Sequence, residues 1–458
     1  MKTNKLFINC IAVAVLSIVL LTTITSYYRF GVCSSGSVFS NQSYETPIYI
    51  GPYEITPVEY TYMYYKIIYD QYPHLLGRSF ESIEDFLKNQ PAIKNESITD
   101  TIKDQTTYEL KKLLCFYQYC LDNNISLDES ELSTEFKNHN VLAQMYNISY
   151  DSMLSFFGPE MTESSVNRIN LWCLARDKVS SLVKDKIIHS NDIENYYLAH
   201  KNDFDVFNID YMCIPVQNLS NKDETVSELT QLYAKTHSRK DFISQTTQFK
   251  ANNAELNITI HNGEELLLQG SELKDNLSSD IVNWIVSPER TADNIALFDG
   301  NNYITLIYYN YRTVDQTPTF NISEIQMEST IKNSSYLFSE DTLINTCSDI
   351  NKNISSVSFF DALMYIATNY STSFSLTAVE NKTIAISNTN PQLEGWLLSE
   401  NIGKTKCFLL DDNILSVVFI NGEGLPSYQE KILEVLVKNK IKDITSTYWS
   451  MFSNTHNF

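Results

Sequence analysis

The sequence has none of the short motifs that mark the common catalytic sites. It contains no phosphate-binding glycine loop, no Gly-x-Ser-x-Gly nucleophile turn and no His-Glu-x-x-His metal pair. Its seven histidines are scattered, and its cysteines include no Cys-x-x-Cys pair that could bind zinc. We therefore predict no catalytic residue, no bound cofactor and no metal.

Basic charge is also scarce. The chain has 34 Lys and Arg against 55 Asp and Glu, a formal net charge of −21. Such a chain repels phosphate backbones, which argues against nucleic-acid binding, and it lacks the polybasic stretches that hold proteins on anionic lipid. The excess of acidic residues is sufficiently explained by a surface charge that keeps the protein soluble.

Cysteines and paired acids give little chemistry. Cys115 and Cys120 share one predicted helix, where a five-residue offset points them apart, so we expect no disulfide between them. Most cysteines fit small core positions. The acidic pairs Asp411-Asp412 and Glu264-Glu265 lie in predicted turns, and we expect solvated carboxylates there because an acid/base dyad requires desolvation.

The first residues indicate the compartment. Lys2 and Lys5 precede an apolar run from Leu6 to Leu21, as in segments that the export machinery recognises. The run lies between a signal-peptide core and a full membrane span, which needs roughly 20 apolar residues. Residues 1–30 are therefore predicted as an uncleaved single-pass anchor or a cleaved signal peptide, followed by a linker at 31–46. Either places the bulk of the chain outside the cytoplasm, at the cell membrane or secreted.

The first half of the remaining chain is predicted to be helical. Pro47 to Ile55 indicates a short strand or hairpin turning at Gly51-Pro52. Thr56, Pro57 and Glu59 then supply a cap, a first helical residue and a capping box. The predicted helices are 58–72, 99–123, 128–138, 150–157, 160–187 and 191–201.

The second half alternates strands and helices, and it contains a weak repeat. Predicted strands are 207–216, 258–260 and 303–309, and predicted helices are 222–249 and 281–286. Phe207-Asn208-Ile209 recurs as Phe320-Asn321-Ile322, Trp284 to Ser287 as Trp396 to Ser399, and Thr305 to Tyr308 as Ser416 to Phe419. The offsets (113, 112 and 111) are nearly constant, which indicates a tandem duplication of an α+β unit.

A last helix, 426–449, carries apolar residues on one face. It follows the second α+β unit directly, so we expect its apolar face to pack on the helical N-terminal part.

This arrangement resembles the bacterial extracytoplasmic foldases of the SurA/PrsA type. Ile50 to Thr56 is similar to that family's Val-Asn-Gly-Glu-x-Ile-Thr opening of the helical domain. Glu194 to Tyr197, with Asn202 and Phe204, is similar to the stretch that precedes its parvulin-type prolyl-isomerase module. The resemblance implies a split helical chaperone domain (47–204, completed by 425–458) and two tandem parvulin-like modules (205–315 and 316–424, the second degenerate). It covers nearly the whole chain.

The family's catalytic residues do not carry over. Parvulins resemble one another in a His on the first strand and another on the last, whereas here the first-strand positions hold Tyr211 and Glu324 and the closing strands hold no His. Prolyl isomerisation does not need a nucleophile; it needs a pocket that binds the twisted imide better than the planar one. The missing histidines therefore lower the expectation of activity without removing it.

We therefore predict a membrane-anchored chaperone that captures unfolded exported polypeptides, with a homodimer possible. The alternatives are an active, divergent prolyl isomerase and a surface scaffold with one fixed partner. Tyrosines crowd the first helix and suit adaptable peptide contact, although such a stripe belongs more often to a core. They are Tyr60, Tyr62, Tyr64, Tyr65, Tyr69 and Tyr72.

Overall fold

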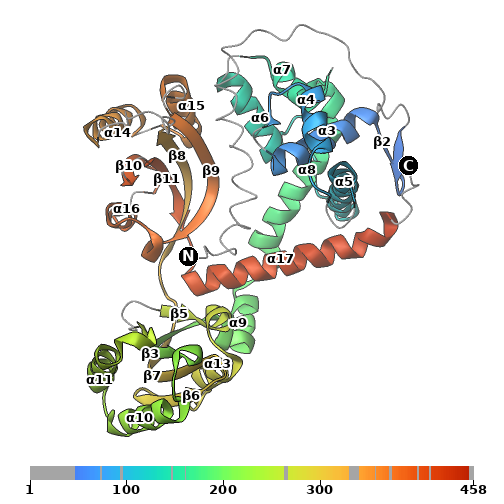
Figure 1. The fold of residues 1–458 in the computed structure, drawn as a ribbon. Coiled ribbons are helices and arrows are strands. Elements are labelled where there is room, and N and C mark those ends of the chain that lie inside the picture. The colour runs from blue at the N-terminus through green and yellow to red at the C-terminus, as the bar shows by residue number, and fades with distance from the viewer. Residues whose placement is uncertain are drawn as a thin grey trace. The chain divides into compact units, whose positions relative to one another are not determined.

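The computed structural model describes residues 47–72, 75–92, 96–145, 148–159, 161–261, 267–329, 340–355, 357–370, 374–399, 402–411 and 414–452. Over these residues the chain is an α+β protein with antiparallel strand pairing, which confirms the predicted combination of helices and sheets (Figure 1). It divides into two compact units. The first takes in the chain up to Ile188, Pro318–Leu425 and the residues from Val435 onwards. The second is His189–Thr317 with Pro426–Glu434.

The predicted export segment (1–30) and linker (31–46) lie outside the described residues. Among the helices that are described, none is long and apolar enough to span a membrane.

The first unit begins with a hairpin and a group of helices. Its opening follows the sequence: Gly51 has φ of +58° at the hairpin turn, and Thr56 caps the next helix. Glu59 N donates to the Thr56 side chain at 3.3 Å, and Thr56 N donates to the Glu59 carboxylate at 2.8 Å. The elements are β1 (Ile48–Ile50), β2 (Tyr53–Ile55), α3 (Pro57–Gln71), α4 (Phe80–Lys88), α5 (Ile98–Asp122), α6 (Thr134–Met145), α7 (Tyr150–Leu154), η2 (Ser155–Phe157), α8 (Glu163–Leu182) and the π-helical turn η3 (Val183–Ile187).

The helix predicted at 128–138 is wrong at its start, because α6 begins only at Thr134. The Asp128 side chain accepts from both Ser130 N (2.9 Å) and Ser130 Oγ (2.7 Å). Such a local turn competes with helix formation at its own backbone.

The C-terminal helix α17 (Ser427–Trp449) packs on these helices through its residues from Val435 onwards. Ile444 is buried in one cluster with Phe116 and Val179. Trp449 lies 5.0 Å from the ring of Tyr108, and the following turn η7 (Ser450–Phe452) ends in a fully buried Phe452.

The first unit also contains a four-stranded sheet, here called module 2. The strand order is β9-β8-β11-β10. Met327 on β8 faces α14 and α15 residues such as Ile350 and Ala362, whereas Phe320 and Ile322 face Leu393 of α16. Its elements are β8 (Thr319–Ser329), α14 (Glu340–Ile354), α15 (Phe359–Tyr370), β9 (Phe374–Ala385), η6 (Ile386–Asn388), α16 (Pro391–Leu397), β10 (Thr405–Asp411) and β11 (Ile414–Glu423).

The second unit is built on a corresponding sheet, here called module 1, preceded by α9 (Ser190–Phe204). The strand order is β4-β3-β7-β6, and β5 also pairs with β3. The elements are β3 (Asp205–Pro215), η4 (Val216–Asn218), α10 (Lys222–Lys235), α11 (Arg239–Asn252), η5 (Ala254–Leu256), β4 (Thr259–His261), β5 (Leu267–Gln269), α12 (Gly270–Asn276), α13 (Ser279–Val286), β6 (Asn294–Asp299) and β7 (Tyr303–Val314).

The single helix predicted over 222–249 is wrong, since two helices occupy this stretch. The first ends at Lys235, and Ser238 caps the second by accepting from Asp241 N at 3.2 Å. Arg239, at the start of α11, forms a bidentate pair with the fully buried Asp210 of β3, which fixes the new helix on the sheet.

The two modules share their strand register. Tyr211 pairs with Ile307 in module 1, and Glu324, 113 positions after Tyr211, pairs with Val418, 111 positions after Ile307. The offsets are those of the repeated segments in the sequence. The modules therefore have equivalent positions that can be compared one by one.

Candidate functional site

The two modules each place a Trp against a Phe at equivalent positions. The Trp284 ring lies 6.0 Å from Phe298 in module 1, and the Trp396 ring lies 5.3 Å from Phe408 in module 2, both edge-on. Phe298 pairs with Thr305 as Phe408 pairs with Ser416. The Trp-bearing helix thus covers the corresponding end of the same sheet face in both modules.

The remaining part of this face in module 1 carries a group of partly exposed side chains. Tyr211 pairs with His261 across β3 and β4, and their rings stack with centroids 4.5 Å apart. The next row places Cys213 beside Thr305, with Sγ and Oγ1 3.4 Å apart, and Phe298 beyond. Tyr211, Cys213, His261 and Phe298 are each neither buried nor fully exposed. We call these residues with Thr305 the Tyr211 face.

Burial favours the neutral forms of the Tyr211 hydroxyl and the Cys213 thiol. Desolvation raises the pKa of the Tyr211 hydroxyl to about 12, so it is a neutral hydrogen-bond donor near pH 7. Desolvation also raises the pKa of the Cys213 thiol, with Thr305 opposing the shift. The Tyr211 hydroxyl and the Cys213 thiol are therefore neutral, and with the Phe298 ring they suit an uncharged ligand segment such as a peptide backbone.

Module 2 fills the equivalent place with a closed ionic network. Glu324, at the position of Tyr211, is 5% exposed, and it accepts from Ser416 Oγ at 2.6 Å and Gln326 Nε2 at 3.1 Å. Lys382 Nζ lies 3.1 Å from the same carboxylate. Burial raises the Glu324 pKa, but these partners outweigh it and the net pKa is lowered, so the group is ionised at neutral pH. Its lone pairs are directed to the module itself and away from a ligand.

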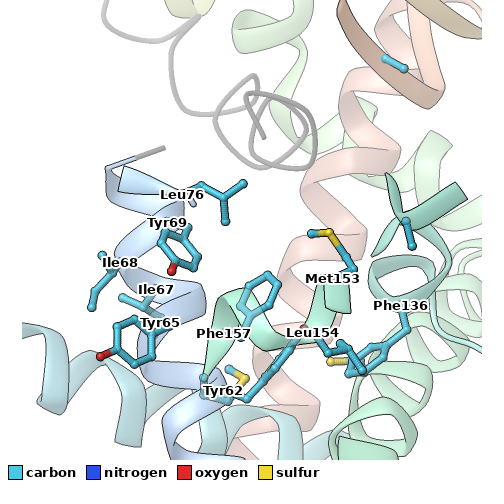
Figure 2. Close-up of a cluster of buried hydrophobic side chains, with 14 of the residues drawn as sticks. Tyr62, Tyr65, Ile67, Ile68, Tyr69, Leu76, Phe136, Met153, Leu154 and Phe157 are labelled. Atoms are coloured by element: carbon cyan, nitrogen blue, oxygen red, sulfur yellow. The ribbon is translucent and has the colours of Figure 1, made fainter. Parts of the chain in front are cut away.

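Most tyrosines of α3 are core residues, and Tyr64 alone among the five is partly exposed. Figure 2 shows Tyr62 and Tyr69 beside Phe157, and the Tyr65 ring lies 4.7 Å from Phe80 in the same hydrophobic cluster. The three tyrosines are at most 4% exposed, and Tyr62 stacks on Phe136 at 5.5 Å. A client-binding groove formed by this stripe is therefore excluded for these three side chains, and the core interpretation is correct.

A partly buried charged cluster lies beside Tyr62. Glu135 accepts from Tyr62 Oη at 2.8 Å, Arg176 lies 3.7 Å from it, and Lys66 pairs with Asp70 at 2.7 Å. Burial raises the Glu135 pKa, but Lys66 and Arg176 outweigh it and hold the pKa below its usual range. The charges compensate one another at the edge of the core, which is the arrangement expected of a structural network.

Sequence reasoning located Tyr211 and Glu324 but missed His261. The sequence predicts the strand at 258–260, but the pairing of β4 with β3 joins residues about 50 positions apart, and no local pattern indicates it. The predicted solvation of the two acidic pairs is not tested by the structure. Glu264, Glu265 and Asp412 lie outside the described residues, as does the side chain of Asp411. Within the described ranges, no three His, Cys, Asp or Glu side chains gather in a way that could hold a metal ion.

Comparison with known proteins identifies no family for this chain. A scan against protein-family models finds no match, and a search of curated proteins finds no significant relative.

Proposed function

We propose that this chain is an extracytoplasmic, membrane-anchored protein of the SurA/PrsA foldase type that binds unfolded exported polypeptides. Its helical part, closed by the C-terminal helix, would be the chaperone domain, and modules 1 and 2 would be parvulin-like. Supporting this, both modules have the expected order of strand, helices, Trp-bearing helix and closing strand. The packing of Ile444 and Trp449 on the N-terminal helices is also what a split helical domain requires.

One contrast carries the proposal: equivalent positions hold the partly exposed Tyr211 in module 1 and the buried, ion-paired Glu324 in module 2. Aromatic rings with polar tips offer broad apolar contact at low entropic cost, which suits weak binding of many sequences. A proline ring or aliphatic side chain can lie on Tyr211 and Phe298 while the Tyr and His polar atoms bond to the peptide backbone. Module 1 is thus the binding module, and module 2 is a structural copy.

Binding without catalysis is the form of this function that the side chains favour. Accelerating prolyl isomerisation requires groups that bind the twisted imide more tightly than the planar one. The Tyr211 face lacks the paired histidines of the parvulin pattern and has one His only, on β4. We therefore expect peptide capture with little or no acceleration of isomerisation.

The test uses the full chain in lipid nanodiscs, so that its N-terminal segment is retained. The protein is added to chemically denatured citrate synthase, and aggregation is followed by light scattering. We expect suppression at near-stoichiometric ratios, weakened by Tyr211→Ala and unchanged by Tyr233→Ala, an exposed tyrosine on α10 of the same module. Equal suppression by both variants would place client binding away from the Tyr211 face. No suppression by the wild type would favour a scaffold with one fixed partner.

A divergent prolyl isomerase is the second candidate, and the convergence of Tyr211, His261, Cys213 and Thr305 on one face favours it. The same preparation is assayed with a short Ala-Ala-Pro-Phe peptide. A proline-dependent rate enhancement that His261→Ala abolishes would establish catalysis in module 1. If the peptide isomerises at its uncatalysed rate, peptide binding remains the proposed function.

A further inference from the structure

Two cysteines of module 2, far apart in the sequence, meet in the fold. Cys347 lies on α14 and Cys407 on β10, and their thiols are within hydrogen-bonding contact. Asn351, one turn after Cys347, joins the two elements. Cys407 N donates to Asn351 Oδ1 at 2.7 Å, and Asn351 Nδ2 donates to the Cys407 carbonyl oxygen at 3.1 Å and approaches Cys347 Sγ at 3.7 Å.

We propose that Cys347 and Cys407 form a disulfide that joins α14 to β10 in module 2. The helix already packs on this strand, and the two hydrogen bonds between Asn351 and the Cys407 backbone hold the two elements together beside the thiols. The inference depends on the geometry of module 2 alone and stands whether or not the protein binds polypeptides.

The surroundings of the two thiols assign their roles in forming the bond. Cys347 is partly exposed, whereas Cys407 is 2% exposed. The hydrogen bond from Cys407 lowers the pKa of the Cys347 thiol, burial opposes this, and Lys406 and Asn351 lower it further. The hydrogen bond with Cys347 and burial raise the pKa of Cys407. Cys347 is therefore the thiolate that an external reagent reaches first.

The chemistry is thiol–disulfide exchange with a disulfide-bearing oxidant RSSR. The Cys347 thiolate attacks one sulfur of RSSR, which forms a Cys347–SR mixed disulfide and releases RS⁻. Cys407 then loses its proton to solvent and attacks Cys347 Sγ, so the second RS⁻ leaves and the Cys347–Cys407 bond forms. Two protein thiols are oxidised, and one disulfide is reduced to two thiols.

Three other described cysteines have partners of a different kind. Cys120 Sγ donates to the Ala175 carbonyl oxygen and Cys173 Sγ to the Glu135 carboxylate, both at 3.8 Å, and Cys213 contacts Thr305. Cys213 is partly exposed like Cys347, and its variant is therefore the matched control.

The test incubates the reduced full chain with oxidised glutathione at pH 8, quenches it with an alkylating reagent and maps its peptides without reduction. We expect one peptide pair joining Cys347 to Cys407, two hydrogens lighter than the sum of its reduced parts. The Tm of the transition that includes module 2 should rise by roughly 10 °C, as expected for the closed loop between Cys347 and Cys407, and fall again on reduction.

Variants separate this bond from other oxidation. Cys347→Ser should abolish the linked peptide pair and the rise in Tm, and Cys213→Ser should retain both. Cys347→Ser replaces a partly exposed side chain and is expected to fold, so the result does not depend on the buried Cys407. Full alkylation of both thiols after oxidation, or a link from either to another cysteine, would overturn the proposal.

Discussion

Asn310 of β7 and Asn421 of β11 occupy the same place in two different sheets. Each is the extra residue of a β-bulge: pairing passes from Asn208–Tyr311 to Ile209–Tyr309 in module 1, and from Asn321–Gly422 to Ile322–Ile420 in module 2. Each also bonds to the neighbouring first strand. Asn310 Nδ2 donates to Asp210 Oδ2 at 2.8 Å, and Asn421 Nδ2 donates to Ser323 Oγ at 3.0 Å. A shared bulge with the same side chain is strong support for duplication, because bulges are retained as features of a fold.

The bulge asparagines should stabilise their own modules separately. Asn310→Ala removes a donor from the buried Asp210 and Asn208 side chains and should cost about 1–2 kcal/mol. Exchange of β3 and β7 amides with deuterium should then speed up roughly 5- to 30-fold, with β8 and β11 unchanged, and Asn421→Ala should give the converse. The exposed Asn301→Ala is the control and should leave both regions as in the wild type.

The β1–β2 turn should depend on glycine because Met451 and Phe452 pack against it. A Cβ at Gly51 would lie 2.8 Å from both the Met451 carbonyl oxygen and Phe452 Cδ1. Gly51→Ala should therefore cost about 2–4 kcal/mol, the sum of strain at positive φ and overpacking.

Gly77 provides the matched control for this change. It also has positive φ (+77°), but nothing lies within 4 Å of a Cβ there, so Gly77→Ala should cost only about 1 kcal/mol. The comparison is made by urea denaturation, and by trypsin digestion of the end of α17. Equal losses for the two variants would mean that the contact with Phe452 adds nothing.

Acid should destabilise the helical part through His139. Burial lowers the pKa of His139 to about 4, Glu135 opposes this and Lys66 adds to it, and Nδ1 is buried without a hydrogen-bond partner. The unfolded chain, with a His pKa near 6.5, binds the proton more readily, so stability is complete above that pH and is lost as pH falls from 6.5 towards 4.

The variant His139→Phe isolates this effect and keeps ring packing against Phe157, whose centroid is 4.8 Å away. Between pH 7.5 and pH 5 the wild type should lose about 2 kcal/mol from this group, and the variant should lose correspondingly less. The free energy of unfolding is taken from urea titrations at both pH values. Identical pH slopes for the two proteins would contradict a buried neutral His139.

Module 2 should lose stability in acid as Glu324 becomes protonated. Its folded pKa lies below the ordinary value of 4.5, so its contribution is complete above that pH and is lost as pH falls through the folded pKa. Glu324→Gln should cost about 1–3 kcal/mol at pH 7, because Lys382 loses its partner, and should flatten the decline below pH 4.5. Amide exchange of β8 and β11 reports this region. Glu380→Gln is the control: it removes the same charge at an exposed position on β9 and should leave the amide exchange unaltered.

Local signals in the sequence were sufficient where one stretch of chain determines its own structure. The Thr56–Glu59 capping box, the turn at Gly51 and the apolar face of the last helix all fall in this group. The break between α10 and α11 was missed because neither Gly nor Pro marks it, although Ser238 and Asp241 form a local helix-start signal there. The pairing of Arg239 with Asp210, which holds the second helix on the sheet, is tertiary.

The candidate site could be predicted only in part, for the same reason. The strand periodicity places Tyr211 and Glu324 at equivalent positions, but it does not indicate that one is partly exposed and the other ion-paired. His261 and the Cys347–Cys407 contact depend on pairings between segments tens of residues apart. Burial of the α3 tyrosines likewise depends on α6 and η2, which supply Phe136 and Phe157.

The most direct test of the central claim is the affinity of the full chain in nanodiscs for an unfolded, proline-containing fluorescent peptide, measured by anisotropy. Tyr211→Ala should weaken binding about 5- to 30-fold, the loss expected for one aromatic contact residue, and Tyr233→Ala should leave Kd unchanged. Circular dichroism on both variants checks that the fold is retained. An unchanged Kd for a folded Tyr211→Ala protein would contradict peptide binding on the Tyr211 face.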